Sequence, residues 1–426
     1  MKYLAMALFA IILVIPTLSD AGNASSRYDI TFGGFVKYDL GYSTQNMHAD
    51  PTVADRQSGS FEWLADKYGN TFQTAGETRF NFLIRGPALE NAKTSAFIEG
   101  DFRGVTTGNS YGGFQLRHAF MSLNWQSAEL MLGQNWQQWG MPYYNAALGN
   151  NDFGQYLGGI RTPQATFRYF FTKTFNAMIG VTSATEWSGS DDIRQFDDGY
   201  ARSGWPGIIG EIAYSADRCG KVGPDNLKFA LGAYYGKEKK IWPPIGTARE
   251  YRDTDLNAWI TAFRFSIPFV PEKPGNKKMS LLLNGNFFYG QNVSGNSWMM
   301  PGGPSNGSYW RNIRTNEAAA PVVFGTFAQL SWWLTDTLWV NGMFGYLKYK
   351  YSSILRDFLP DNVNMMQTYG VNLLWDVNES MRFGIQWMTM FTGYNRAWLY
   401  PALGFKDTGD RTGQIDQYRI AAWYFF

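Results

Sequence analysis

The chain is poor in the residues on which many soluble folds and most metal sites depend. Charged residues make up 17% of its 426 positions, against about 25% in an average soluble domain. It has one cysteine, Cys219, and two histidines, His48 and His118. One cysteine excludes a disulfide scaffold, and so few thiols and imidazoles argue against a multi-ligand metal site. We therefore expect no metal and no cofactor.

Long apolar runs and a strong net charge are also missing. Past the N-terminus no stretch of about 20 apolar residues occurs, which excludes a helical membrane protein. The formal net charge of +2 gives no basic field for nucleic acid, so that class of partner is not expected. What the chain does have is aromatic residues, at 17%, and 46 glycines. Such an aromatic content excludes a disordered chain.

The N-terminus has the layout of a secretory signal peptide. Lys2 precedes an apolar run over residues 4–15, and small or polar residues follow up to Ala24. The run is too short to span a bilayer, so an anchor helix is the weaker alternative. We expect residues 1–24 to be cleaved, after Ala21 or Ala24, and residues 25–426 to form one exported domain.

Strict alternation of apolar and polar residues recurs along the rest of the chain. Successive side chains of a strand point to opposite faces, so each run predicts a strand with one apolar face. The last run has Tyr418, Ile420, Ala422, Tyr424 and Phe426 on one face. Similar runs of about ten residues, the length of a tilted membrane strand, lie at 36–42, 79–85, 164–171, 175–182, 228–235, 368–375 and 381–387.

The polar face of these runs carries Arg, Lys, Glu and Asp repeatedly. Burying that many charges in the dry core of a soluble sandwich would be very costly. The cost disappears if the aromatic face meets lipid and the charged face lines a water-filled lumen. The sequence therefore predicts an all-β fold, a transmembrane antiparallel barrel surrounded by outer-membrane lipid.

Connector lengths support a count of about sixteen strands. Strands are expected near 32–43, 76–86, 92–103, 115–125, 128–136, 164–171, 175–183, 206–216, 227–237, 254–267, 278–291, 321–334, 337–350, 366–376, 381–391 and 414–426. Connectors after odd-numbered strands are mostly long, as at 137–163, and those after even-numbered strands are mostly short, as at 172–174. Long outer loops alternating with short periplasmic turns are typical of bacterial barrels. Two of the expected turns, 217–226 and 268–277, are longer than the others.

Charged residues in the inward phase are candidates for the pore lining. Arginine stays charged and offers a fork that suits carboxylates, which favours small anionic solutes. Some of these residues could instead pair with neighbours and only hold the barrel in shape. The predicted pore-lining residues are Arg79, Arg85, Glu99, Asp101, Arg103, Arg168, Arg264, Arg382 and Arg419. Lys37, Asp39, Glu211 and Lys228 share the same phase.

Four short segments resemble the DcaP-like family of outer-membrane porins: TRFNF at 78–82, IEGDFRG at 98–104, LRHAF at 116–120 and LGQNW at 132–136. The resemblance implies a sixteen-stranded homotrimer for passive diffusion of small hydrophilic solutes, with a preference for small anions such as dicarboxylates. Unlike some members, the chain has no coiled-coil stretch between the leader and the first strand. The final aromatic strand is similar to the C-terminal signature of bacterial barrels, which implies that Tyr424 and Phe426 are recognised by the barrel assembly machinery.

The third outer connector, which follows the fifth expected strand, is the candidate constriction. In sixteen-stranded porins, as the resemblance implies, the third outer loop folds into the pore, and residues 137–163 hold that position. The loop is rich in glycine and aromatic residues, which an exposed flap needs less, although a surface flap stays open as an alternative. Its candidate constriction residues are Tyr143, Tyr144, Asp152, Tyr156 and Arg161.

Three other functions remain as alternatives. His118, Ser122 and Asn124 share one strand face, as in an outer-membrane phospholipase, but residues four apart on a strand are about 13 Å apart. That is too far for a nucleophile and its base, so we expect no enzyme. A sugar-specific channel of eighteen strands would use an aromatic track made of Trp259, Phe288, Trp339 and Trp423. An adhesin barrel is supported only by the long outer loops.

Overall fold

The structure, a computed structural model, describes residues 28–45, 69–104, 112–149, 156–157, 161–182, 204–242, 252–292, 309–312, 317–351, 363–394 and 412–426. The predicted signal peptide, residues 1–24, lies outside these ranges. No helix long and apolar enough to cross a membrane occurs in the described part of the chain.

The described residues form one antiparallel barrel wall and a small separate hairpin. The wall contains β1 (Asp29–Ser43), β2 (Asn70–Thr74), β3 (Arg79–Arg85), β4 (Lys93–Gly104), β5 (Gly113–Asn124), β6 (Ala128–Trp136), β7 (Arg161–Phe170), β8 (Phe175–Thr182), β9 (Gly207–Val222), β10 (Asp225–Trp242), β11 (Arg252–Val270), β12 (Leu281–Gln291), β15 (Val322–Trp333), β16 (Leu338–Lys350), β17 (Val363–Asp376), β18 (Met381–Tyr394) and β19 (Thr412–Phe425). The hairpin is β13 (Tyr309–Asn312) with β14 (Glu317–Ala319).

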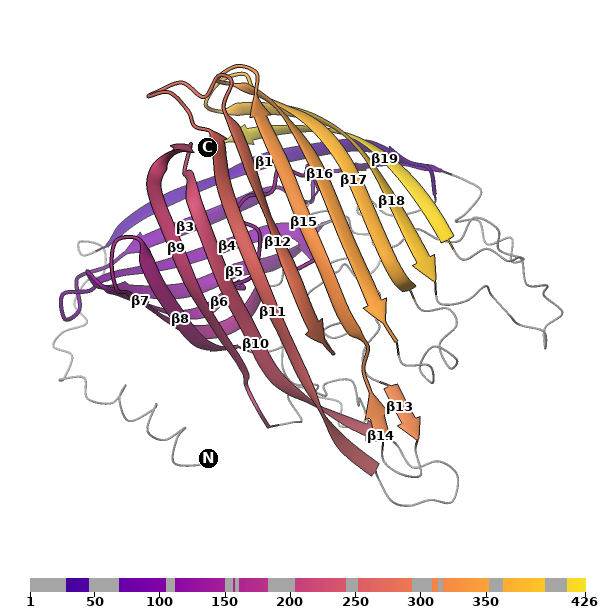
Figure 1. Cartoon of the computed structure of the whole chain (residues 1–426). Helices are drawn as coiled ribbons and strands as arrows, with labels where there is room; N and C mark the ends of the chain where they lie inside the picture. The colour runs from indigo at the N-terminus through magenta and orange to yellow at the C-terminus, as the bar shows by residue number, and fades with distance from the viewer. Residues whose placement is uncertain are drawn as a thin grey trace.

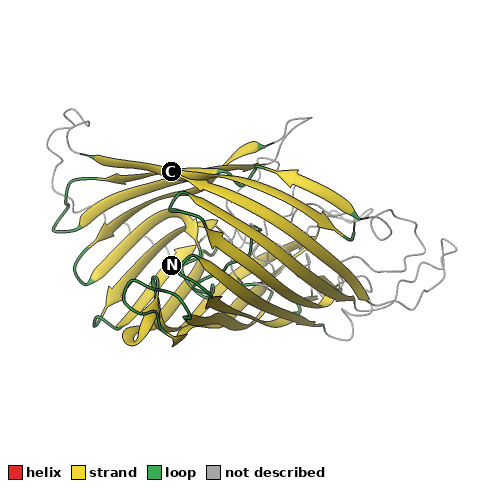
Figure 2. Cartoon of the chain, turned by 90° about the horizontal axis from the view of Figure 1, so that it is seen from above, coloured by secondary structure: helices red, strands yellow, loops and turns green. Residues whose placement is uncertain are grey.

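The wall closes because the first strand pairs with the last. Residues 35–43 of β1 pair with residues 417–425 of β19. On its other side β1 pairs with both β3 and β2, which are therefore two pieces of one wall position. The barrel thus has sixteen strands, which confirms the predicted count and excludes the eighteen-stranded alternative. Strands surround the interior in both views (Figures 1 and 2).

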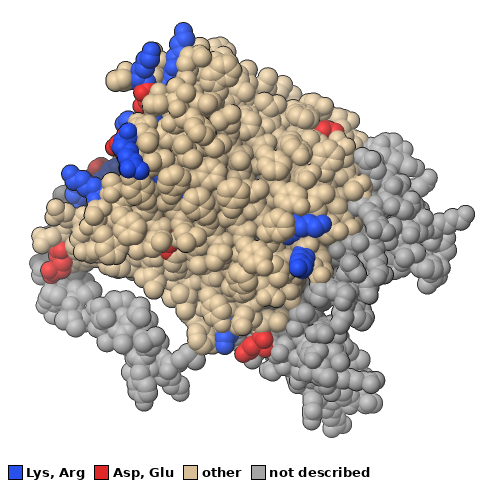
Figure 3. All heavy atoms as spheres, in the orientation of Figure 1, with Lys and Arg blue, Asp and Glu red and all other residues tan. Residues whose placement is uncertain are grey.

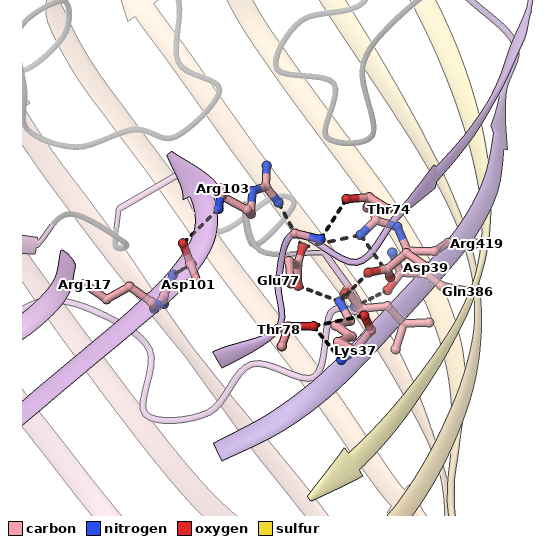
Figure 4. A network of polar contacts seen from close by, with 12 residues as sticks. Lys37, Asp39, Thr74, Glu77, Thr78, Asp101, Arg103, Arg117, Gln386 and Arg419 are labelled. Carbon is pink, nitrogen blue, oxygen red and sulfur yellow. Dashed lines mark hydrogen bonds and ion pairs between the residues drawn. The ribbon is translucent and has the colours of Figure 1, made fainter. Parts of the chain in front are cut away.

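The break between β2 and β3 is the main departure from the predicted strands. The sequence predicts one strand from residue 76, whereas the wall position starts at Asn70 and leaves the ladder at residues 75–78. Local hydrogen bonds hold the break: Gly76 N–H donates to Thr74 Oγ1 (3.0 Å) and Lys37 N–H donates to Thr78 Oγ1 (3.1 Å). The break places Glu77 next to β1 on the inner side of the wall (Figure 4).

The two faces of the strands follow the predicted alternation. Val36 and Ile385 are 51% and 53% exposed on the outside, whereas their neighbours Lys37 and Gln386 are buried on the inside. On the face of the barrel that Figure 3 shows, the described surface accordingly carries few charged side chains over most of its height. Trp259 lies outside as well, where its ring contacts Tyr289 (5.4 Å between centroids). The proposed aromatic sugar track is therefore interrupted.

A β-bulge in β5 changes the phase of the pattern. Glu99 pairs with His118, but the next residue, Gly100, pairs with Leu116, so Arg117 is the extra residue. Such a bulge leaves one residue out of the ladder and turns the strand locally. As a result Arg117 and His118 are both buried on the inner side.

Gly133 in β6 has a backbone that only glycine adopts without strain. Its φ is +130°, and an added Cβ would lie 2.3 Å from the carbonyl oxygen of Ala119. We expect Gly133→Ala to lower the free energy of unfolding in detergent by about 2 kcal/mol or more. Gly342→Ala is the control, because a Cβ there meets nothing within 4 Å. Equal urea-unfolding curves for the two variants would contradict this reading of β6.

Candidate functional site in the barrel lumen

The connector between β6 and β7 contacts the inner side of distant strands. Asn286 of β12 donates from Nδ2 to the carbonyl oxygens of Gly140 (2.8 Å) and Leu157 (3.2 Å). Further round the barrel, the Tyr156 hydroxyl is hydrogen-bonded to Thr368 Oγ1 of β17 (2.8 Å). We call the described residues 137–149 and 156–157 the inner loop. Both ends of the inner loop are thus held on β12, and the second end is also held on β17.

Side chains from the wall hold the middle of the inner loop by its backbone. Ala146 N–H donates to Gln329 Oε1 (2.8 Å), and Asn372 Nδ2 donates to the carbonyl oxygen of Ala146 (2.6 Å). Two residues on, Leu148 N–H donates to Gln386 Oε1 (2.9 Å). The carbonyl oxygen of Leu148 accepts from Lys37 Nζ. The backbone N–H and C=O groups of Ala146 and Leu148 are therefore all satisfied by side chains of β1, β15, β17 and β18, as a buried backbone requires.

Lys37 belongs to a buried charge cluster, which we call the Lys37 cluster and which also contains Asp39, Glu77, Arg419 and Arg103 (Figure 4). Lys37 Nζ lies 2.5 Å from Glu77 Oε2 and 3.1 Å from Asp39 Oδ2. Arg419 lies 3.6 Å from Asp39, and Arg103 donates to Glu77 Oε1 (2.9 Å). Buried charges persist only when they are paired. Glu77, which lies in the break of the wall, forms ion pairs with both Lys37 and Arg103 and so links them.

A second group, the Arg117 cluster, lies on β3, β4 and β5. Arg117 Nε donates to Glu99 Oε1 (2.7 Å) and its Nη1 donates to Asp101 Oδ2 (2.6 Å). Arg79 is 4.0 Å from Glu99, and His118 Nε2 is 3.7 Å from the same carboxylate. The bulge in β5 makes this cluster possible, because it turns two successive residues inward.

A third group, the Glu211 cluster, fixes the start of the inner loop. Arg264 Nη2 lies 2.5 Å from Glu211 Oε1, and Arg168 lies 3.9 Å from the same oxygen. Arg264 also donates from Nη1 to the carbonyl oxygen of Met141 (3.2 Å). Its guanidinium sits over the ring of Tyr143, 4.4 Å from the centroid. This cation–π contact and the hydrogen bond together tie the loop to β11.

Cations and aromatic rings alternate along the inner wall near the short-turn end. Arg79 lies over Phe35 (5.3 Å), whose ring is 5.8 Å from that of Phe425. Arg382 lies over Phe425 (5.4 Å) and Trp339 (4.9 Å). A bidentate pair with Asp376, with N–O distances of 2.5 and 3.0 Å, fixes the Arg382 fork. Arg79 and Arg382 stay partly exposed, so they present charge to the lumen.

A cavity of about 440 Å³ lies between the inner loop and this part of the wall. Among the described residues, the charged lining consists of Lys37, Arg79 and Arg382 with one carboxylate, Glu77. The loop contributes residues 141–149, and Tyr143 and Tyr144 are among them. Burial raises the pKa of both tyrosines and of Tyr156. These hydroxyls therefore stay neutral and act as hydrogen-bonding groups.

Most of the sequence-predicted pore residues come together in these clusters and around the cavity. They are Arg79, Glu99, Asp101, Arg103, Arg168, Arg264, Arg382 and Arg419. Arg85 is separate, because it is half exposed at the end of β3 and pairs with Asp29 (3.0 Å). Of the loop residues, Arg161 lies over the ring of Trp136 (5.3 Å), and Asp152 lies outside the described residues.

The two residues predicted to be recognised by the barrel assembly machinery lie on the outer face of the barrel. Tyr424 and Phe426 point outward and are about half exposed. Phe426 also completes the barrel seam, since its N–H donates to the carbonyl oxygen of Gly34 (3.2 Å) and its own carbonyl oxygen accepts from Gly34 N–H (3.1 Å).

Several residues of the site were not predicted. Glu77 lies two residues before Arg79, so the alternating pattern places both side chains on the same inward face. Glu77 could therefore have been found from the sequence. Arg117 has the opposite parity to His118 and Ser122, which also face inward, and the bulge allows both sets to do so. The amides that hold the loop, Gln329, Asn372, Gln386 and Asn286, face inward but carry no charge, and charge was the property used to choose candidates.

The described ranges contain no group of three or more His, Cys, Asp or Glu side chains placed to hold a metal ion.

Comparison with known proteins gives a structural likeness and no sequence match. No family model and no curated protein matches the chain. The outer membrane channel DcaP of Acinetobacter baumannii is similar in structure, with a TM-score of 0.68 and 15% identity over 96% of this chain and 100% of that one. An anion-selective porin from Comamonas acidovorans follows with 0.54 and 11% over 94% and 100%. OmpT of Vibrio cholerae gives 0.52 and 8% over 96% and 99%.

At these identities the likeness shows the fold. It is the closed sixteen-stranded barrel of outer-membrane channels, over almost the whole length of both chains. The match to the DcaP channel agrees, at the level of the fold, with the family resemblance of the four short segments.

Proposed function

We propose that this protein is a porin of the bacterial outer membrane, through which small hydrophilic solutes diffuse passively with a preference for small anions such as dicarboxylates. The observation that carries the proposal is the cavity beside the inner loop, whose charged lining among the described residues is Lys37, Arg79 and Arg382 with the carboxylate of Glu77. Charged rings in a narrow lumen set which ions pass. A surplus of cations at this point favours anions.

The barrel and the inner loop support the channel part of the proposal. A barrel of sixteen strands is wide enough to leave an aqueous lumen. The inner loop, the predicted constriction, is held against β1, β12, β15, β17 and β18 by hydrogen bonds. A solute that passes the loop meets Arg79 and Arg382, whose guanidinium groups are oriented by aromatic rings and by Asp376. A guanidinium group that is held in a fixed orientation binds a carboxylate better than a mobile one does.

Ion selectivity tests the anion preference directly. We expect Arg79→Gln/Arg382→Gln to lower the anion-to-cation permeability ratio by about threefold or more, since two exposed lumen charges are removed. The reversal potential of purified protein in planar bilayers under a salt gradient gives this ratio. Arg85→Gln is the matched control, because Arg85 lies at the rim and pairs with Asp29. Wild-type protein that favours cations would refute the preference.

We propose further that the protein works as a homotrimer and that the barrel assembly machinery recognises its last strand. One of the similar structures is OmpT of Vibrio cholerae in a trimer form, with a TM-score of 0.52. The outward, half-exposed rings of Tyr424 and Phe426 are accessible to a recognition partner. Mild cross-linking in isolated outer membranes should give a product of three chains. Phe426→Ala should reduce the amount of folded barrel in the membrane.

A further inference from the structure

Two neighbouring turns at the short-turn end of the barrel pack against each other. One is the end of the β9–β10 hairpin, residues 217–224, and the other is the β11–β12 turn, residues 271–280. Glu272 N–H donates to the carbonyl oxygen of Lys221 (2.8 Å), and Gly223 N–H donates to Glu272 Oε2 (2.8 Å). The turn between β7 and β8 adjoins them, because Ser215 N–H donates to the carbonyl oxygen of Thr174 (2.8 Å). The three turns therefore form one body.

This body carries many cations. We call it the basic rim, and its cations are Lys173, Arg218, Lys221, Lys273, Lys277 and Lys278. They outnumber the carboxylates of the same turns, which already accept hydrogen bonds: Asp217 from Asn226 (2.7 Å) and Glu272 from Gly223. Asp336 of the neighbouring β15–β16 turn accepts from Lys277 N–H (2.5 Å). Lys and Arg gather visibly at this edge of the molecule, at the upper left of Figure 3.

Exposed apolar side chains adjoin the same cations. Phe269, Val270 and Met279 are 58%, 45% and 53% exposed beside Lys273 and Lys278. Met279 also has a φ of +65°, which is unfavourable for its side chain, and its N–H donates to the carbonyl oxygen of Trp333 (2.6 Å). Local strain of this kind persists where the surroundings impose it, and it often marks a functional segment. Here the strained residue presents an apolar side chain to the surroundings of the barrel.

We propose that the basic rim binds the headgroups of anionic phospholipids in the leaflet at the short-turn end of the barrel. Apolar residues next to lysines, at the end of a membrane strand, match the boundary between acyl chains and headgroups. The ammonium groups donate to phosphate oxygens, while Phe269, Val270 and Met279 contact acyl chains. An acidic protein or an anionic cell-wall polymer could also pair with the lysines. Either partner would leave these apolar side chains exposed to water.

Lipid retention by the purified full-length chain tests the proposal. Native mass spectrometry would compare phosphatidylglycerol with phosphatidylethanolamine of the same acyl chains. We expect Lys273→Gln/Lys278→Gln to weaken retention of phosphatidylglycerol roughly tenfold and to leave phosphatidylethanolamine unchanged. The matched control, Lys93→Gln/Lys350→Gln, removes the same charge at exposed positions away from the basic rim. It should retain both lipids as the wild type does.

Three results would overturn the proposal. One is equal retention of the two lipids by the wild-type protein, and another is the same loss of phosphatidylglycerol in both double variants. The third is binding to cell-wall sacculi that Lys273→Gln/Lys278→Gln abolishes while phosphatidylglycerol retention is unchanged, because the partner would then be the wall polymer. Conductance in bilayers is measured separately, so a failure of the proposed channel function would be distinguishable.

Discussion

Lys37→Met is expected to lower the free energy of unfolding of the barrel by about 3–5 kcal/mol, the usual cost of removing one partner from a buried ion pair. Lys37 is 1% exposed and lies within 3.1 Å of both Asp39 and Glu77. Without the ammonium group, the two buried carboxylates lose their nearest cation, and the guanidinium groups of Arg419 and Arg103 remain near them. Methionine fills nearly the same volume, so the effect is electrostatic rather than steric.

Urea unfolding in detergent, followed by the shift between folded and unfolded bands on a gel, measures this effect. Lys37→Met/Glu77→Gln should recover more than half of the loss, because it also removes the carboxylate that lay 2.5 Å from the ammonium group and has lost its nearest cation. Lys93→Met is the control at an exposed position on β4. If Lys37→Met were no less stable than Lys93→Met, the Lys37 cluster would have no role in holding the wall at the break.

The fold was largely predictable because one physical constraint acts on every strand. A wall between lipid and water must alternate strictly, and runs such as residues 381–387 show that alternation directly. The break between β2 and β3 was not predictable in this way. Residues 75–78 continue the parity of the strand, and what interrupts the ladder is a set of hydrogen bonds to Thr74 and Thr78. Those hydrogen bonds depend on where β1 lies relative to residues 75–78, and the alternation of apolar and polar residues does not specify that position.

Alternation predicted part of the charge on the inner face of the wall, but it did not predict the contacts. Alternation places Arg382 and Arg419 inside, and the structure has them there. The pairing of Arg117 with Glu99 and Asp101 needs a bulge that shifts the phase by one residue, and the sequence of β5 does not show where the shift falls. The amides of Asn372 and Gln386 are ordinary inward residues until the inner loop is placed against them.

Asn372→Leu should release the middle of the inner loop and make the channel more conductive and noisier. Asn372 is the donor to the carbonyl oxygen of Ala146, and its own Oδ1 accepts from Asn341 Nδ2 (2.6 Å). Leucine has nearly the same shape but cannot donate, so a buried carbonyl group loses its partner at a cost of about 1–3 kcal/mol. That cost is enough to raise the population of a displaced loop roughly tenfold or more.

Single-channel recordings at fixed voltage would show the release as a larger mean conductance with frequent brief transitions. Asn364→Leu is the matched control, because Asn364 Nδ2 donates to the carbonyl oxygen of Tyr394 (2.8 Å) on the barrel wall. Gln386→Leu should act in the same direction through Leu148 N–H. Because Asn372 Nδ2 also donates to Gln386 Oε1 (3.2 Å), the double variant should add less than the two single effects together. Unchanged conductance and noise in Asn372→Leu would mean that these hydrogen bonds do not hold the loop in place.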